Sequence, residues 1–175
     1  MGIFRSVFLA AVLLCAGSAL NADIHVVTNG NDSGAGSLRQ AINDADPGDT
    51  ITFQLSGVAT ISISSQLSIT KSLTIDGANS AGSGTHVTVQ VTVPGVTASR
   101  VFFLNASDTV SISNMTIKGG DISGNGNTDA GTGGGIYLRS GTLNLSNSTV
   151  SGSKAFSGGG RQISSVDRLR HQHWH

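Results

Sequence analysis

The first regular pattern of apolar residues in the chain has the period of an α-helix. Four of them follow the i, i+3, i+4, i+7 spacing of an amphipathic helix: Leu38, Ala41, Ile42 and Ala45. Ser37 and Gln40 have the spacing of a capping box at the N-terminal end, and the Pro47-Gly48 pair ends the pattern. The pattern predicts a short helix over residues 37–45, whose apolar stripe needs a surface to cover.

From residue 49 onwards the apolar residues recur at every second position, which is the pattern of β-strands with one buried face. The pairs and runs that show this period are Ile51 and Phe53, Ile61 and Ile63, Leu67 and Ile69, Leu73 and Ile75, Val87 through Val93, Val101 and Phe103, and Val110 and Ile112. Gly, Asn, Ser and Asp separate these segments, as they do in turns. The chain therefore continues as many short strands.

Two segments of this strand region are copies of each other. Residues 107–119 (SDTVSISNMTIKG) recur 33 residues later as residues 140–152 (SGTLNLSNSTVSG), with apolar positions matched throughout. A weaker copy, residues 67–77, aligns with the first after a one-residue slip between its two strands. The glycine runs 133–135 and 158–160 are a further sign of the repeat. A strand-only repeat of this length indicates a stacked array of similar units.

The short strands, joined by turns that contain Asn, favour a coil around one apolar axis over a propeller. A propeller blade would need four longer strands and an aromatic signature. In a coil, equivalent residues of successive turns stack, so we expect Asn114 over Asn147 and Ile112 over Leu145. Asn also tolerates the left-handed backbone conformation that a tight turn between two strands requires.

The beginning of the chain has the features of a secretory signal peptide over residues 1–22. Arg5 precedes an apolar run that is too short to span a bilayer, and small residues follow it, so cleavage after Ala19 or Ala22 fits. Cys15 is the single cysteine of the chain and lies inside this segment. We therefore expect a mature protein without disulfides, held together by backbone hydrogen bonds and stacked apolar side chains.

The composition of the chain changes after Gly160, where the repeat predicts another apolar residue. Residues 161–175 contain no Gly but hold three of the five His and the single Trp. Two hypotheses remain open for this tail: a C-terminal cap helix with Ile163, Val166 and Leu169 at three-residue steps, or an out-of-frame or truncated reading frame, which we favour. The expected organisation is a signal peptide (1–22), a cap (23–49), β-helix rungs (50–160) and the non-repeat tail.

Composition and charge argue against a nucleic-acid-binding function. Charged residues make up 11% of the chain, the formal net charge is zero, and every acidic residue is Asp. Nucleic-acid binding requires a basic surface, so we expect no nucleic-acid partner. Membrane attachment would come only through the signal peptide or through an anchor domain that is missing from the sequence.

Two parts of the sequence resemble a known class of proteins. Residues 27–42 (VTNGNDSGAGSLRQAI) followed by 48–53 (GDTITF) resemble the opening of bacterial right-handed β-helix proteins. Residues 134–138 (GGIYL) and 143–152 (LNLSNSTVSG) resemble the repeats of chlamydial-type polymorphic outer-membrane proteins and other autotransporter passengers. The resemblance implies an all-β fold, a right-handed single-stranded parallel β-helix (solenoid) with a short N-terminal capping helix, in a protein at the cell surface.

The charged residues do not form an evident catalytic set. A polysaccharide lyase or glycosidase of this fold needs clustered Asp with Arg or Lys on one exposed face. The aspartates that we expect in solvated turns are Asp44, Asp46, Asp49, Asp76 and Asp108, and the cations that we expect as solvated surface charges are Arg39, Lys71, Arg100, Lys118 and Arg139. The sequence therefore predicts no catalytic residue and no cofactor site.

Candidate metal ligands occur in two places. Asp121, Asn125, Asn127 and Asp129 alternate as in calcium-binding loops, but no acidic residue closes the site downstream, so a Gly/Asn-rich loop is the favoured interpretation and calcium the minority one. The imidazoles of the tail could bind a transition metal: His171, His173 and His175. His25 and His86 are isolated in the sequence, and we predict no metal site.

The sequence favours an exported, non-catalytic surface protein, an adhesin or passenger-type stalk, as a fragment of a longer protein that is secreted or held at the cell surface or outer membrane. The alternative is the N-terminal part of a β-helix carbohydrate-active enzyme, a polysaccharide lyase or glycosidase. A third class is a binding array built on outward threonines such as Thr88 and Thr92. Expected partners are host or cell-surface glycans or proteins, and a second copy of the chain through an open C-terminal rung.

Overall fold

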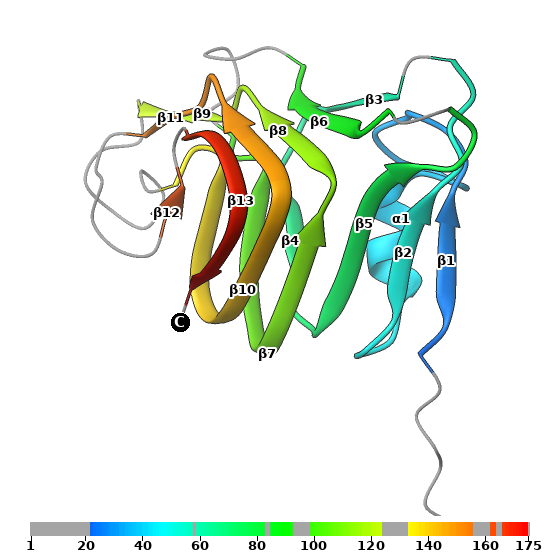
Figure 1. The fold of residues 1–175 in the computed structure, drawn as a ribbon, viewed down its shortest axis with the longest axis horizontal. Coiled ribbons are helices and arrows are strands. Elements are labelled where there is room, and N and C mark those ends of the chain that lie inside the picture. Colours follow the sequence, from blue (N-terminus) through cyan, green and yellow to red (C-terminus); the bar gives the residue numbers. More distant parts are fainter. Residues whose placement is uncertain are drawn as a thin grey trace, which may run out of the picture.

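The chain folds as a right-handed, single-stranded parallel β-helix that is capped by a short helix (Figure 1). The computed structural model describes residues 22–57, 59–82, 85–92, 99–123, 133–155, 162–163 and 166–174. Nearly all of the predicted signal peptide lies outside these ranges. Within them, no helix has the length and apolar character needed to cross a bilayer.

Three faces make up each complete turn of the helix. The first face holds β4 (Leu67–Ile69) and the beginnings of β7 (Phe102–Ser113) and β10 (Ile136–Ser151). The second holds β1 (Ile24–Val27), β2 (Thr50–Phe53), β5 (Leu73–Asn79) and the later parts of β7 and β10. The third holds β3 (Thr60–Ile63), β6 (Val87–Val91), β8 (Met115–Lys118) and the end of β10, while β9 (Asp121–Ile122) pairs with β11 (Lys154–Ala155).

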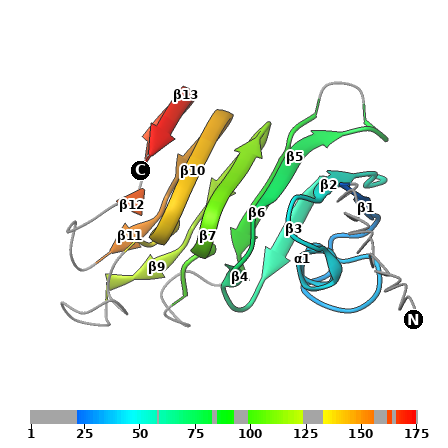
Figure 2. The same ribbon diagram turned by 90° about the horizontal axis from the view of Figure 1, so that it is seen from below.

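All of these strand pairs are parallel, and Figure 2 shows the rungs side by side from α1 and β1 to β13. Inward side chains of the three faces fill one continuous apolar core. The largest fully buried side chains of the strands are Ile51, Phe53, Ile61, Ile63, Leu67, Ile69, Leu73, Ile75, Phe102, Leu104 and Ile112. Outside the start of β7 each lies between polar neighbours that point outward, so most of the observed strands follow the two-residue period of the sequence.

The expected alternation fails at the start of β7. The sequence placed Val101 and Phe103 on one inward face, but Phe102 and Leu104 are the fully buried residues, and Phe103 is partly exposed. Val101 is also buried, but it lies at a bend before the strand begins and is therefore outside the pleat. Four consecutive apolar residues carry no period of two, so the pattern alone left the register of this strand open.

The predicted asparagine stack is confirmed. Asn114 and Asn147 are the residues other than glycine with a positive φ in the described part of the chain, at 54° and 46°. The side-chain amide of Asn147 donates to the Asn114 amide oxygen at 2.6 Å, and Asn114 in turn donates to Asp76 at 2.7 Å. Ile112 and Leu145 pair across the same two rungs, as expected.

The expected alignment of the weaker repeat copy is wrong. Residues 73–76 pair with the Val110–Ser113 segment of β7, whereas the repeat alignment would have matched them to residues 115–118. Gly77 then lies beside the left-handed turn at Asn114, where an added Cβ would collide with the Asn114 carbonyl. The alternation of this segment fits either strand, and only the tertiary stacking selects one.

Helix α1 (Leu38–Asp44) covers the first rung, as the apolar stripe predicted, with Leu38, Ala41 and Ile42 buried. The Ser37 hydroxyl accepts a hydrogen bond from the Gln40 backbone N–H at 3.2 Å. The second half of the expected capping box does not form, because the Gln40 side chain donates to Asp44 at 2.6 Å instead of reaching back to the cap.

The tail does not form the cap helix that was one of the two hypotheses. In its described part, β12 (Gln162–Ile163) and β13 (Val166–Trp174) pair with β10 in the antiparallel direction. The three-residue apolar steps of the tail therefore do not correspond to a helix. The backbone edge of β10 that was expected to be open is covered by β13 from Leu143 to Val150.

Candidate functional site

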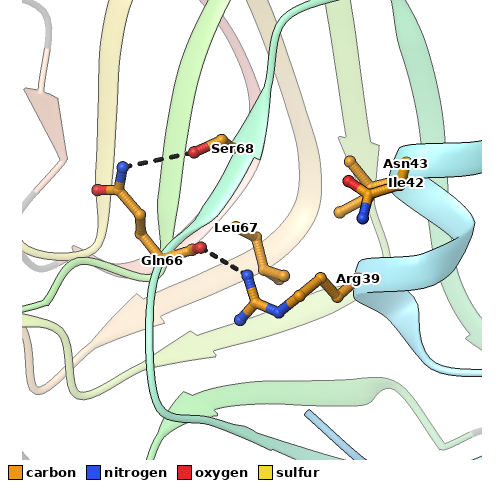
Figure 3. Close-up of a pocket in the computed structure, with 6 residues that line it drawn as sticks. All are labelled: Arg39, Ile42, Asn43, Gln66, Leu67 and Ser68. Atoms are coloured by element: carbon orange, nitrogen blue, oxygen red, sulfur yellow. Dashed lines mark hydrogen bonds between the residues drawn. The ribbon is translucent and has the colours of Figure 1, made fainter. Parts of the chain in front are cut away.

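A hollow of about 240 Å³ lies between α1 and β4, lined by Arg39, Ile42, Asn43, Gln66, Leu67 and Ser68 (Figure 3). Arg39 extends from the helix towards β4, and its guanidinium donates to the carbonyls of Gln66 and Ser65, each at 2.8 Å. Its Nη2 also donates to the carboxylate of Asp32 at 2.6 Å. Arg39 was expected to be a solvated surface charge, and that expectation is wrong.

The carboxylate of Asp32 extends this hydrogen-bond network from Arg39 to Ser64. It accepts the Ser64 hydroxyl at 2.5 Å and the Ser64 backbone N–H at 3.2 Å. Burial opposes the ionisation of Asp32, but the hydrogen bonds from Ser64 and Arg39 outweigh it and hold the pKa below its ordinary value. Because Arg39 is neutralised by Asp32 and engaged by three protein groups, the hollow joins the cap to the first face and is poorly suited to bind an anion.

Lys71 has a similar structural role at the other end of α1. Its ammonium donates to the carbonyls of Asn43 and Ala45, which are unpaired groups at the C-terminal end of the helix. Lys71 was also expected to be a solvated surface charge, and it is instead a C-terminal cap.

The outer side of the first face carries an aromatic strip, which we define as Gln66, Ser68, Arg100, Phe103 and Tyr137. Phe103 lies between Ser68 and Tyr137 in the strand register. The rings of Phe103 and Tyr137 are 5.8 Å apart, and the Arg100 guanidinium lies 5.7 Å and 5.1 Å from their centroids. Arg100 also donates to the Gln66 side chain at 3.2 Å.

Arg100 is 7% exposed, so the expectation of a solvated surface charge is wrong for this residue as well. A guanidinium held over two rings is stabilised by the negative ring faces and stays charged. Phe103 and Gln66 are partly exposed and Ser68 is exposed, so this strip presents part of an aromatic ring, an amide and a hydroxyl to solvent. These groups suit a ligand with apolar C–H faces and many hydroxyls.

His25 and Asp49 form a second polar cluster, at the base of β1. The His25 Nε2 lies 2.9 Å from the carboxylate of Asp49, which also accepts the backbone N–H groups of Asp23 and Asp46. These hydrogen bonds, first that of Asp46, then those of Asp23 and His25, hold the pKa of Asp49 below its ordinary value. Asp49 is buried, so the expectation that it solvates a turn is wrong, as is the expectation that His25 is isolated.

Beside this cluster, a groove of about 250 Å³ runs between β1 and α1. Ile24 and Val26 on its β1 side are 68% and 45% exposed. Its polar lining residues already have partners within the protein: His25 contacts Asp49, the Ser37 hydroxyl accepts the Gln40 N–H, and the Gln40 side chain donates to Asp44.

The other aspartates of the predicted turns have structural partners or lie in turns. Asp44 accepts the Gln40 side chain and Asp76 accepts Asn114, as described above, and the Asp46 backbone donates to Asp49. The side chain of Asp108 lies outside the described residues. Of the remaining cations, Lys118 and Arg139 are exposed, as expected.

Asp121 is the described part of the predicted calcium loop. Its carboxylate accepts the hydroxyl and the backbone N–H of Ser123, and these bonds lower its pKa, against burial and with help from Lys154 at 3.9 Å. Asn125, Asn127 and Asp129 lie outside the described residues, so calcium binding there stays a hypothesis.

The histidines of the tail are placed only by their backbone. His171 and His173 lie on β13 opposite Ser146 and Asn144, and His175 lies outside the described residues. His86 is exposed and forms an isolated backbone bridge with Ala78. Among the described residues, no three His, Cys or Asp side chains gather as metal ligands would.

The threonines singled out in the sequence belong to different environments. Thr88 stands in a column of four threonines in register on the third face: Thr60, Thr88, Thr116 and Thr149. Thr92 lies outside this column, and its hydroxyl donates to the Ile63 carbonyl at 3.0 Å. The sequence therefore found the outward threonines, but not which of them stack.

Part of the chain is similar in sequence to one class of enzymes. A probable pectate lyase C of Aspergillus fumigatus is 42% identical over 67 residues, which are 38% of this chain and 15% of that protein. A probable pectate lyase C of Aspergillus flavus is 40% identical over 65 residues, or 37% of this chain. The chain is similar to pectate lyases over this stretch. It spans about 15% of the length of these relatives. Neither a family model nor a solved structure matches the chain.

Proposed function

We propose that this chain consists of β-helix rungs from an exported carbohydrate-active protein, a polysaccharide lyase directed at an acidic polysaccharide of the pectate type. The observation that carries the proposal is the 42% identity over 67 residues to a probable pectate lyase, in a chain with parallel β-helix architecture. This supports the enzyme alternative over the non-catalytic stalk, which no described contact favours.

The aromatic strip is the described surface that fits such a substrate best. Phe103 offers a ring on which the C–H face of a sugar can lie, and Gln66 and Ser68 offer hydrogen-bonding groups beside it. Arg100 supplies fixed positive charge close to the same surface, which favours a uronate over a neutral sugar. In this proposal the described residues bind the polymer, and the groups that break its glycosidic bond are not assigned.

Export is the part of the proposal that concerns location. The signal-peptide features of residues 1–22 support a secreted protein. Attachment to an outer membrane, and the likeness to bacterial surface passengers, remain expectations about the full-length protein.

Affinity electrophoresis of the full chain in gels that contain polygalacturonate tests the proposal. We expect retardation by polygalacturonate but not by neutral dextran, and weaker retardation for Phe103→Leu, which removes the ring but keeps an apolar side chain. Incubation with the polymer should also be followed by ultraviolet absorbance, because a lyase leaves an unsaturated sugar at the new chain end. Equal mobility in the presence and absence of polygalacturonate would contradict the proposal.

A further inference from the structure

The third face of the β-helix carries two outward columns of polar residues, which together we call the threonine face. One column is the stack of Thr60, Thr88, Thr116 and Thr149, and the neighbouring column is Ser62, Gln90, Lys118 and Ser151. These residues alternate with the buried Ile61, Val89, Ile117 and Val150, which fixes their side chains on the outer surface.

The described strands of this face are in regular register. The paired registers of β3 with β6 and of β6 with β8 run without a bulge, whereas β10 pairs with β7 through two register shifts. Successive rungs are about 4.8 Å apart, so the columns repeat a hydroxyl at nearly the length of one pyranose unit in an extended polysaccharide. A polymer that runs across the rungs would therefore meet an equivalent group at each sugar.

The hydroxyls of the threonine column are available for a ligand. Gln90 donates to Ser62 at 3.3 Å, but within the described residues none of the four threonine hydroxyls has a hydrogen-bond partner. Thr88 and Thr116 are partly exposed and occupy the middle of the column. Each threonine also presents a methyl group, which suits the C–H face of a sugar ring.

The charge of the face selects among polysaccharides. Lys118 is exposed in the second column, and the two columns contain no acidic residue. On the second face, by contrast, Asp76 occupies the register position beside Ser113. A cation without a competing carboxylate in its columns favours an acidic polymer over a neutral one.

We propose that the threonine face is a second binding surface, on which an extended polyuronate chain lies across the rungs, hydrogen-bonded to Thr88 and Thr116 and attracted by Lys118. This inference rests on the proposed function for the class of polymer, but it concerns a different face from the aromatic strip. Its role is to hold the polysaccharide on the protein, and it includes no bond-breaking step.

The test compares matched variants of the full chain in the polygalacturonate gel. The double variant Thr88→Val/Thr116→Val removes two hydroxyls and keeps the β-branched shape, and it should raise the dissociation constant at least about fivefold. Thr50→Val/Thr74→Val makes the same change in a stacked pair on the second face and should leave binding unchanged. Thermal unfolding of each variant shows that the fold is retained.

The charge at residue 118 is tested separately. Lys118→Gln should weaken binding and reduce its sensitivity to salt, while Lys118→Arg should retain both, because exposed charges act through a screened attraction. If the native chain binds polygalacturonate and the Thr88/Thr116 and Lys118→Gln variants bind equally well, the inference is wrong and the proposed function stands. If the native chain does not bind the polymer, both fail.

Discussion

The left-handed turns at Asn114 and Asn147 show how single residues set the shape of a rung. Each turns the chain between the second and third faces with a positive φ, which costs a β-branched residue about 1–2 kcal/mol. The side-chain bonds from Asn147 to Asn114 and on to Asp76 then join three rungs. Asparagine is favoured because it accepts the backbone conformation and also bonds to its neighbour.

Replacement of Asn147 by valine should therefore lower the free energy of unfolding by about 1 kcal/mol or more. Asn147→Gly keeps the permissive backbone and loses only the amide bond, so it should cost less than the valine variant. Urea denaturation of both variants measures the difference. A valine variant as stable as the native chain would mean that the turn lies elsewhere.

The lowered pKa of Asp49 predicts how the stability of the fold changes in acid. Because its pKa lies below the ordinary value of 3.8 in the folded state, the unfolded state binds the proton more readily. The stabilising effect is complete above about pH 5 and is lost as the pH falls through the lowered pKa. Asp49→Asn should be less stable than the native chain near neutral pH and should lose less stability on acidification. Parallel curves of unfolding free energy against pH would contradict this assignment.

At the scale of elements, the capping of α1 can be tested by two neighbouring substitutions. Ser37→Ala removes the hydroxyl that accepts the Gln40 N–H and should cost about 1 kcal/mol. Gln40→Ala should cost only a few tenths, because the Gln40 side chain does not return to the cap. Thermal unfolding compares the two. A larger loss for Gln40→Ala would indicate that the complete capping box forms in solution.

The sequence predicted the elements whose pattern is local. Helix α1 and the alternating strands have clear periods, and the Asn turns recur with the repeat. The start of β7 and the register of residues 73–76 were mispredicted, because adjacent apolar residues or a repeated alternation fit more than one stacking. The cap helix, one of the two hypotheses for the tail, is wrong, and the strand that forms instead was not predicted because its backbone bonds depend on β10.

The sequence pattern also did not predict the polar clusters. Arg39 meets Ser65 and Gln66 only when the cap lies against the first face, and Arg100 meets Phe103 and Tyr137 only when two rungs stack. Charged residues that are spaced widely in the sequence were therefore predicted to be separate surface groups. The threonine column was visible as outward threonines, but its members are assigned only by the strand register.

At the scale of the whole molecule, β13 shields the backbone edge of β10 from other strands. Removal of residues 162–175 should expose the backbone groups of β10, and exposed strand edges pair with other chains. Analytical ultracentrifugation should then show concentration-dependent association of the shortened chain and a monomer for the full chain. A monomeric shortened chain would contradict the shielding role of β13.

Disulfide cross-linking tests most directly the stacking of rungs on which both proposed surfaces depend. In a Cys15→Ser background, cysteines at Thr88 and Thr116 face each other in register, with Cα atoms about 4.8 Å apart, within the range that a disulfide spans. Cysteines at Thr88 and Lys118 are two residues out of register and too far apart to bridge. We expect rapid intramolecular oxidation of the first pair alone, seen as a mass loss and a mobility shift that reductant reverses. Equal oxidation of both pairs, or of the second pair alone, would contradict the register and with it the threonine face.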